Sequence, residues 1–463
     1  ATAYELARVG CRVLVLEQAP HVGGCIRTER TPEGYVIEHG PNSLLNLNPE
    51  VDRFCHELGL DQERVFQDPR SRRRYLVKAG RLVPVPSRFH QIPLTPLWSA
   101  KAKFRALAEP FIPVRTGEGD ESVASFVGRR FGREMVEYGV EPFVAGIFAG
   151  DPDQLSMAAS FPRVAALERE YGSVVAGLIG TRFRRREARA PLRVFSFREG
   201  VGALPEALRR NLGDRVRTGV RVVEVMRRLR DGIPSFVVRA EEDGIDRMWT
   251  ADRLVMATPA DVSARLVHHL SPLLADQLEQ IPYAPVGLVH LGVSRSALTR
   301  FPGGSGCLVP KREGLSILGS LWSSNVYPNR APEGSVLLTN YVGGVRDSDV
   351  LKWSDRELTD LVVNTLRGLI GLSGAPTFVR VVRHPRAIPQ YVMGHGERVA
   401  AIAGLLGPLS GLFLAGNYLD GVSVRDCLTQ GVVLAQRVAA SFPACGAPAQ
   451  LATGLAPVGQ KNS

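Results

Sequence analysis

The sequence has 463 residues, of which 44% are hydrophobic and 22% are charged. These values are typical of a folded globular protein, and the length predicts two or three domains rather than one. Lysine and arginine (57 residues) outnumber aspartate and glutamate (46 residues), which gives a net charge of +11. Since no zinc-finger spacing, RNA-binding signature or heptad repeat accompanies this charge, the sequence argues against a nucleic-acid partner and favours an anionic lipid surface or an acidic small molecule.

The six cysteines lie at positions 11, 25, 55, 307, 427 and 445, and none belongs to a C-x-x-C pair. Cysteines spread in this way over a large chain indicate a reducing compartment rather than a disulfide scaffold. The nine histidines form no H-E-x-x-H or carboxylate-histidine grouping, so no metal site is expected. No secretory leader is recognisable, and we expect a cytoplasmic chain that is soluble or peripheral to a membrane.

The first 17 residues predict a helix followed by a strand. Residues 1–10 mix apolar residues with alanines and end at Gly10, a natural helix terminator. Residues 11–17 form a β-branched run, expected of a strand buried on both faces, that ends at Glu17. This order is typical of the second half of a dinucleotide-binding βαβ unit, in which the carboxylate binds a ribose. We therefore expect a strand and a G-x-G-x-x-G-like run before Ala1; another βαβ protein with Glu at a strand end is the alternative.

Residues 17–28, EQAPHVGGCIRT, narrow this choice. A Gly23-Gly24 pair shortly after Glu17, followed by Arg27, is typical of large flavoproteins rather than of NAD dehydrogenases. Gly24 allows the backbone to approach a cofactor, and Arg27 can neutralise a phosphate. Residues 35–43 then predict a strand that runs into a turn.

Residues from about 89 to 190 are helical in character. Between 93 and 113, aliphatic and aromatic residues are interleaved with Lys101, Lys103 and Arg105, which predicts one apolar and one basic face. Such a segment can lie on an anionic membrane surface, and the basic run 182–189 adds charge nearby. The alternative is a helix that packs against its own domain.

Strands are expected at 215–225, 235–240 and 253–257. The uncharged stretch 399–419 has the length of a membrane span, but glycines and a proline interrupt it. It predicts instead the end of a helix, a turn, a short strand and a loop. The tail 443–463 has little pattern and is expected to be disordered.

Together these segments resemble the FAD-dependent amine-oxidase superfamily and, within it, the protoporphyrinogen oxidases. The most specific blocks are 141–156 (EPFVAGIFAGDPDQLS) and 318–344 (LGSLWSSNVYPNRAPEGSVLLTNYVGG). The resemblance implies an α/β (α+β) fold with an FAD-binding Rossmann-like domain built from discontinuous segments, a mixed-sheet substrate domain and a helical membrane-associating insertion. The expected ranges are 1–64, 193–260 and 398–442 for the FAD-binding domain, 65–88 and 261–397 for the substrate domain, and 89–192 for the insertion.

The resemblance also implies which residues contact the cofactor. Glu17 is expected at the adenosine ribose, and Val222 at the adenine, where ordinary core packing is the alternative. Ser423 is expected near the start of a helix whose dipole can stabilise negative charge on the reduced flavin. The full set assigned to FAD is Glu17, Gln18, Gly24, Cys25, Arg27, Gly40, Pro41, Asn42, Ser43, Val222, Asn417, Val422, Ser423 and Val424.

The activity implied is the oxidation of protoporphyrinogen IX to protoporphyrin IX in haem biosynthesis, by three two-electron steps in which dioxygen becomes hydrogen peroxide. Flavin N5 accepts the hydride, so no side chain is expected to act as a catalytic acid or base.

A flat apolar macrocycle with carboxylate arms needs an apolar slot and a guanidinium. Arg74 is expected to bind a propionate, whereas Arg72 and Arg73 are expected to belong to a solvated basic turn. Tyr327 stands where close relatives have Phe, and its hydroxyl needs a partner if it is buried. The substrate-binding residues implied are Arg74, Gly146, Leu308, Tyr327 and Asn42.

Three alternatives stay open. Coproporphyrinogen III has more carboxylates, which the arginines of residues 70–74 would suit. Another superfamily activity, such as amine oxidation or carotenoid desaturation, would not be expected to share the block 318–344. A truncated, non-catalytic chain unable to retain FAD is the third. The expected partners are a porphyrinogen, dioxygen and the inner face of the cell membrane, with a homodimer left open and no nucleic acid.

Overall fold

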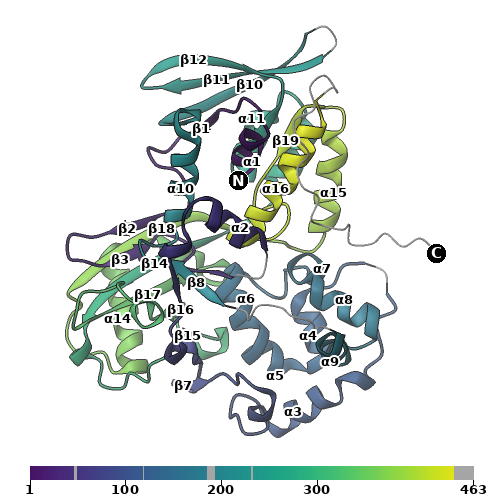
Figure 1. Cartoon of the computed structure of the whole chain (residues 1–463). Helices are drawn as coiled ribbons and strands as arrows, with labels where there is room; N and C mark the ends of the chain where they lie inside the picture. Colours follow the sequence, from purple (N-terminus) through teal and green to yellow (C-terminus); the bar gives the residue numbers. More distant parts are fainter. Residues whose placement is uncertain (46–48, 118, 185–192, 231–232, 443–463) are drawn as a thin grey trace.

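The computed structural model describes residues 1–45, 49–117, 119–184, 193–230 and 233–442. Figure 1 shows the strands of residues 220–251 at the top of the molecule, a large sheet at the lower left and the helices of residues 100–184 at the lower right. The tail predicted at 443–463 and residues 185–189 of the basic run lie outside the described residues. The chain has the α/β architecture that the sequence predicted.

The strand predicted at 11–17 is shorter and less buried than expected. β1 (Val15–Glu17) pairs in parallel with β9 (Val216–Thr218), and its residues are half-buried rather than buried on both faces. Cys11 and Val13 pack instead against side chains of α16 (Val424–Ala440). Because a helix surface offers no free backbone groups to a strand, the ladder does not extend to these residues.

Helix α1 (Thr2–Arg8) ends just before Gly10, whose φ is 86°, as the sequence predicted. Its Leu6 lies in a small core with α16, and that core also contacts a second parallel pair of strands. This pair is formed by β13 (Leu254–Met256) and β19 (Leu412–Leu414). Segments from the beginning, middle and end of the chain therefore form one region.

An antiparallel sheet covers the end of this region (Figure 1). Its strands are β10 (Val220–Arg230), β11 (Ile233–Glu242) and β12 (Ile245–Ala251). Phe236 and Val225 on its inner face are buried. They pack in one core with helices α11 (Ala260–Val267), α12 (Pro272–Glu279) and α15 (His395–Leu406).

Among the described residues, seven strands form the large sheet. In spatial order they are β18 (Phe378–Pro389), β14 (Tyr283–Ser294), β17 (Ser335–Gly343), β16 (Ile317–Leu321), β15 (Gly306–Leu308), β6 (Arg74–Lys78) and β7 (Arg81–Pro84). β15 and β6 pair in parallel and the other neighbours antiparallel, so the sheet joins residues 65–88 to 261–397. Helix α14 (Asp355–Ile370) packs on it through Leu358, Val362 and Leu366, which recur at helical spacing.

Two small sheets hold the segment 39–43 at both of its ends. The hairpin of β2 (Thr28–Arg30) and β3 (Val36–Glu38) precedes it, and β4 (Leu44–Leu45) follows it. β4 pairs with β8 (Val194–Phe197), which also pairs with β5 (Arg64–Phe66). Helices α2 (Pro49–Glu57) and α10 (Ala203–Leu212) pack around these strands.

The lower-right region of Figure 1 is helical, as predicted. Its helices are α3 (Ala100–Leu107), α4 (Val123–Phe131), α5 (Arg133–Met135), α6 (Glu141–Phe148), α7 (Met157–Ser160), α8 (Pro162–Tyr171) and α9 (Val174–Arg184). Arg130 is completely buried and forms ion pairs with Glu109 and Glu168, which join three segments of the region.

The stretch 399–419 contains the end of α15, a turn and β19, which confirms the prediction made for it. No helix in the described part of the chain is both long and apolar enough to cross a bilayer.

Candidate active site

The carboxyl end of β1 lies next to the start of β10. Glu17 Oε1 accepts a hydrogen bond from the Ala19 N–H at 2.8 Å, which orients the carboxylate at the end of the strand. The carbonyl oxygen of Ala19 accepts one from the Gly219 N–H at 3.0 Å, so this turn is tied to the strand that carries Val222. Val222 is half-buried and Gln18 is exposed. The structure thus places the predicted ribose and adenine positions on adjoining backbone.

The turn at residues 23–27 is open on one side. Gly23 and Gly24 have φ values of 100° and 58°, in the left-handed region that favours glycine. No heavy atom lies within 4 Å of where a Cβ on Gly24 would stand, and Arg27 is exposed. Within the described residues the Arg27 side chain forms neither an ion pair nor a hydrogen bond. This turn therefore has the free space and the uncommitted positive charge that a dinucleotide phosphate needs.

Three segments that are distant in the sequence meet beside this turn. A Cβ on Gly40 would overlap the carbonyl oxygen of Cys25, so only glycine lets the segment 39–43 approach the turn so closely. Cys25 also faces the first turn of α16, where burial, Asp426 and Cys25, in that order, raise the pKa of the Cys427 thiol to about 11. The predicted cofactor positions in these segments are consequently close in space.

The start of α16 and the loop before it lie beside these predicted cofactor positions. Ser423 is the N-cap of α16, as the sequence predicted, and its Oγ accepts a hydrogen bond from the Asp426 N–H at 3.2 Å. The Tyr391 hydroxyl donates to the carbonyl oxygen of Asn417 at 2.5 Å. Val422 packs in the core that contains Tyr391, and Val424 packs in the core of α2 and α10. The loop 417–423 is thus fixed at both ends.

Asn42 is held by the large sheet. Its Nδ2 donates to the hydroxyl of Tyr341 in β17 at 2.8 Å. Burial raises the pKa of Tyr341 to about 12, so the phenol is neutral at physiological pH. Pro41 and Ser43 on either side of Asn42 are half-buried. The amide therefore orients by hydrogen bonding and does not titrate, in agreement with the expectation that it is not a base.

Gly146 and Leu308, predicted to contact the macrocycle, touch each other. Gly146 lies on α6 and Leu308 on β15, and a Cβ on Gly146 would come 2.9 Å from Leu308 Cδ2. Gly146 is exposed, as are Phe143 and Ile147 on the same helix. The contact offers an apolar surface with an accessible backbone position, which suits a flat hydrophobic ligand.

Tyr327, the third predicted slot residue, is buried. Burial raises the pKa of its hydroxyl above the ordinary value, while Ser43, Arg330 and Arg74 oppose that rise. The hydroxyl lies near Ser43 but has no hydrogen-bond partner of ordinary geometry among the described residues. The described side chains therefore do not supply the partner that the sequence analysis expected for a buried hydroxyl.

A large cleft opens next to β6 and β7, with a volume of about 1140 Å³. Arginine side chains dominate its charge. Those that line it are Arg72, Arg73, Arg74, Arg88 and Arg193. Among the described lining residues the acid is Asp68, whose Oδ1 accepts a hydrogen bond from the Arg70 N–H at 2.7 Å. The cleft therefore presents a strongly positive surface to a ligand.

The sequence analysis assigned Arg74 to a propionate and placed Arg72 and Arg73 in a solvated basic turn. In the structure, however, all three line the same cleft. Within the described residues, none of these three side chains forms an ion pair. Arg193 lies over the ring of Phe66, with its guanidinium carbon 3.6 Å from the ring centroid. Arg88 and Arg193 were missed because they are far from the cluster 70–74 along the chain. Tertiary folding alone brings them to the same cleft.

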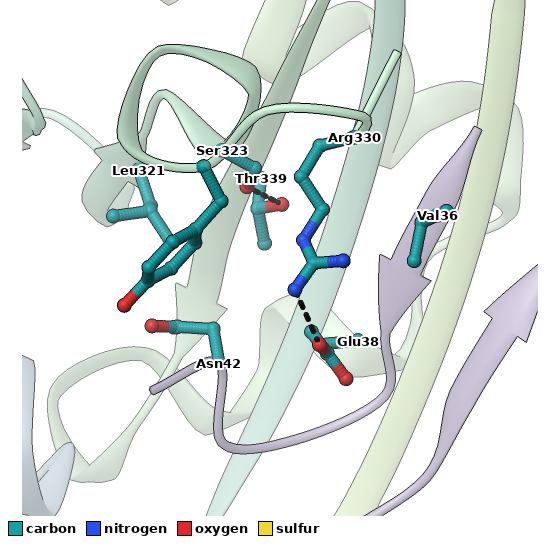
Figure 2. A pocket seen from close by; sticks show the side chains of 8 residues that line it. Val36, Glu38, Asn42, Leu321, Ser323, Arg330 and Thr339 are labelled. Carbon is teal, nitrogen blue, oxygen red and sulfur yellow. Dashed lines mark hydrogen bonds and ion pairs between the residues drawn. The ribbon is translucent and has the colours of Figure 1, made fainter. Parts of the chain in front are cut away.

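Sequence reasoning also missed a buried ion pair beside Asn42 (Figure 2). Glu38 Oε1 and Arg330 Nη2 are 3.6 Å apart, and both side chains are almost completely buried. A single Glu in the apolar run 35–38 was the signal that could have indicated a buried carboxylate, because such a group needs partners. No local pattern indicated Arg330 as the partner.

The chain is similar to known proteins over most of its length. Residues 1–439 match the family model described as flavin containing amine oxidoreductase. The chain is 36% identical to the chloroplastic protoporphyrinogen oxidase of Oryza sativa subsp. japonica over 90% of this chain and 81% of that protein. It is 26% identical to the coproporphyrinogen III oxidase of Bacillus subtilis (strain 168) over 90% and 89% of the two chains. A solved structure from Exiguobacterium sp. 255-15 has the same fold, with a TM-score of 0.78, 24% identity and coverage of 94% and 95%.

Proposed function

Because this chain belongs to the flavin-containing amine oxidoreductases and, within them, to the protoporphyrinogen oxidases, we propose that it oxidises protoporphyrinogen IX to protoporphyrin IX. The chain is an FAD-dependent oxidoreductase. The observation that supports the proposed substrate is the arginine-lined cleft. Arg74 in this cleft is near enough to the buried Tyr327 to oppose the rise that burial causes in the pKa of its hydroxyl, and that hydroxyl lies near Ser43. A carboxylate-bearing macrocycle can thus bind in the cleft with one edge toward the predicted flavin side.

FAD, when bound, supplies the hydride acceptor, and the residues of this chain supply binding and orientation. Glu17 would accept hydrogen bonds from the adenosine ribose, and Arg27 would face a phosphate. Arg74 would hold a propionate, and the contact between Gly146 and Leu308 would support the apolar face of the macrocycle. Each of these groups binds or orients, and none needs to exchange a proton.

We propose dioxygen as the final electron acceptor. Conversion of the porphyrinogen to the porphyrin removes three hydrides and three protons. If oxygen accepts each electron pair, three molecules of dioxygen become three of hydrogen peroxide. The electron balance therefore predicts a fixed ratio of peroxide to porphyrin, which an assay can measure.

The test uses the purified chain incubated with FAD. Retained flavin absorbance, a rise in porphyrin fluorescence on addition of protoporphyrinogen IX, and three peroxides per porphyrin would support the proposal. A chain that retains no flavin would support the alternative of a non-catalytic product. Retained flavin without faster porphyrin formation than in buffer would exclude this substrate. Light scattering of the same preparation would test for a homodimer.

Coproporphyrinogen III is the second candidate substrate. It carries four carboxylates whereas protoporphyrinogen IX carries two, and the cleft offers arginines beyond Arg74 to bind them. Assaying both porphyrinogens with the same preparation separates the candidates. A kcat/KM at least about tenfold higher for one substrate corresponds to about 1.4 kcal/mol of discrimination and would decide between them.

We also propose that the helical region lies on a membrane surface on the cytoplasmic side. Four apolar side chains around α3 are strongly exposed instead of packing against their own domain: Leu94, Phe104, Leu107 and Phe111. Lys101 and Arg105 are exposed on the same helix, so apolar and basic groups are presented together. The expected division into two opposite faces is not seen, because Leu97 and Ala102 provide the buried contacts. Exposed apolar groups flanked by cations suit an anionic interface.

Vesicle sedimentation tests this localisation. The chain should sediment with vesicles that contain anionic lipid and remain in solution with purely zwitterionic ones. Replacing both Phe104 and Phe111 with Ser should release it. The control is Leu273→Ser, since Leu273 is an exposed leucine outside the helical region. Equal binding by all three proteins would contradict the proposed surface.

A further inference from the structure

Glu38 is a buried carboxylate near the predicted flavin side, and both of its oxygens have partners. It lies at the end of β3, where its Oε2 accepts from the Thr28 hydroxyl at 2.5 Å and its Oε1 accepts from the Val201 N–H at 2.9 Å. Arg330 completes the set at 3.6 Å. Burial raises the pKa of Glu38 to about 7, against the opposing effects of Thr28, Arg330 and Val201.

Arg330 connects Glu38 to a different part of the molecule. Its Nη2 donates to Ser196 Oγ at 2.8 Å and to the carbonyl oxygen of Phe197 at 3.0 Å, both in β8. Its guanidinium carbon also lies 5.5 Å from the ring centroid of Tyr327. Since a guanidinium does not lose its proton in a protein, this buried cation depends on Glu38 for a counter-charge.

A small cavity separates this pair from the segment 39–43 (Figure 2). Its volume is about 10 Å³, which is room for about one water molecule. The polar side chains that line it are Glu38, Asn42, Ser323, Tyr327, Arg330 and Thr339. Ser323 and Thr339 bond to each other at 2.9 Å, whereas no described residue gives the Tyr327 hydroxyl a hydrogen bond of ordinary geometry. A buried water normally satisfies such orphaned groups.

We propose that the Glu38–Arg330 pair is a positioning device that holds Tyr327 against the segment 39–43, and that the cavity holds one water bonded to the Tyr327 hydroxyl. This inference rests on the proposed function, because Tyr327 is a predicted wall of the substrate slot. The pair joins β3 and β8 to the segment between β16 and β17 that carries Tyr327, so loss of its charge balance displaces Tyr327 relative to Asn42. The effect reaches the substrate through Tyr327, which makes Glu38 and Arg330 positioning residues.

The proposal predicts a pH-dependent step in kcat/KM. As the pH rises through about 7, Glu38 ionises, the ion pair forms and kcat/KM increases. The groups that face Glu38 are Thr28, the Val201 N–H, Arg330, Tyr327, His290 and Tyr341. Burial lowers the pKa of His290 to about 3 and raises that of Tyr341 to about 12, so neither changes its charge near neutral pH.

Two variants separate positioning from simple loss of stability. Glu38→Gln removes the titrating group, so the step near pH 7 should disappear and KM should rise roughly tenfold with a smaller change in kcat. Arg330→Met leaves a carboxylic acid that can stay neutral, so this variant should fold even if Glu38→Gln does not. Because no ion pair can form without the cation, Arg330→Met should also lack the step in kcat/KM near pH 7.

Glu206→Gln is the matched control. Glu206 pairs with Arg209 at 2.9 Å within α10, and their side chains are 40% and 50% exposed. Its pH profile and KM should equal those of the wild type. A wild-type profile without a step between about pH 6 and pH 8, or a step that neither Glu38→Gln nor Arg330→Met alters, would overturn the positioning role.

Crystals of the flavin-loaded chain without substrate test the water independently of turnover. One ordered water within hydrogen-bonding distance of Tyr327 Oη supports the proposal, and an empty or collapsed cavity overturns this part of it. In Arg330→Met crystals, Tyr327 should move away from Asn42, and an unmoved ring would count against the device. The crystals can show the ordered water and the displaced Tyr327 ring even if the wild type oxidises neither porphyrinogen. In that case the proposed function fails and the structural inference stands.

Discussion

Gly146 of α6 lies directly against Leu308 of β15, because a Cβ on Gly146 would stand only 2.9 Å from Leu308 Cδ2. The neighbouring atom is the end of a flexible side chain, so an added methyl group can be accommodated if Leu308 turns aside. The contact thus couples the backbone of a helix in the insertion to a side chain of the large sheet. Both residues were predicted to meet the substrate, and their relation gives a sharp test.

Gly146→Ala should impair substrate binding while leaving the protein folded. We expect KM for the porphyrinogen to rise about tenfold, since a displaced Leu308 narrows the apolar slot. Steady-state kinetics and the thermal midpoint measure the two effects separately. Gly139→Ala is the control, because a Cβ there would have its nearest neighbour at an ordinary 3.8 Å. Equal KM values for the two variants would show that this contact is not part of the slot.

Arg74→Ala should weaken substrate binding more than any change at Arg70. Loss of one charge-assisted contact to a carboxylate costs about 1.5–3 kcal/mol, which corresponds to a rise in KM of roughly tenfold to a hundredfold. Arg70 is also exposed but is not among the residues that line the cleft, so Arg70→Ala should behave as the wild type. Kinetics at low and moderate salt provide the measurement. Identical KM values for the two variants would place the carboxylate elsewhere.

Arg130→Met should strongly destabilise the helical region. Arg130 is fully buried between Glu109 and Glu168, and removing the cation leaves buried carboxylates without their partner, at a cost of about 3–5 kcal/mol. The urea midpoint, followed by circular dichroism, should fall clearly. Arg133→Met removes an exposed pair with Glu137 and should shift the midpoint little. Similar midpoints for both variants would contradict a structural role for Arg130.

Buried His290 should make the protein less stable in acid. Burial lowers its pKa from 6.5 to about 3 in the folded chain. Between these values the unfolded chain binds a proton that the folded chain does not, so stability falls as the pH falls from about 6.5 toward 3. His290→Gln should therefore flatten the pH dependence of the unfolding midpoint in this window. The exposed His56→Gln should leave the slope unchanged, and a slope equal in all three proteins would refute the assignment.

Local patterns were sufficient where structure depends on neighbours along the chain. The glycine at position 10 ends α1, and the apolar run 254–256 becomes a short parallel strand. Glu17 stands at the end of β1, although this strand is shorter than its β-branched run suggested. Its length was not predictable because a strand extends only as far as another strand pairs with it.

The candidate site also has some features that local sequence predicts and others that depend on the tertiary structure. The amino-acid sequence by itself determined the family, and it predicted the cofactor positions and a propionate-binding role for Arg74, since motifs and glycine positions are written in short segments. Only the tertiary structure decided that Arg88 and Arg193 share a cleft with Arg74, and that Glu38 has Arg330 as its counter-charge. The physical reason is that the energy of a charge depends on which groups surround it and exclude water from it. Those groups come from distant segments that only the folded chain brings together.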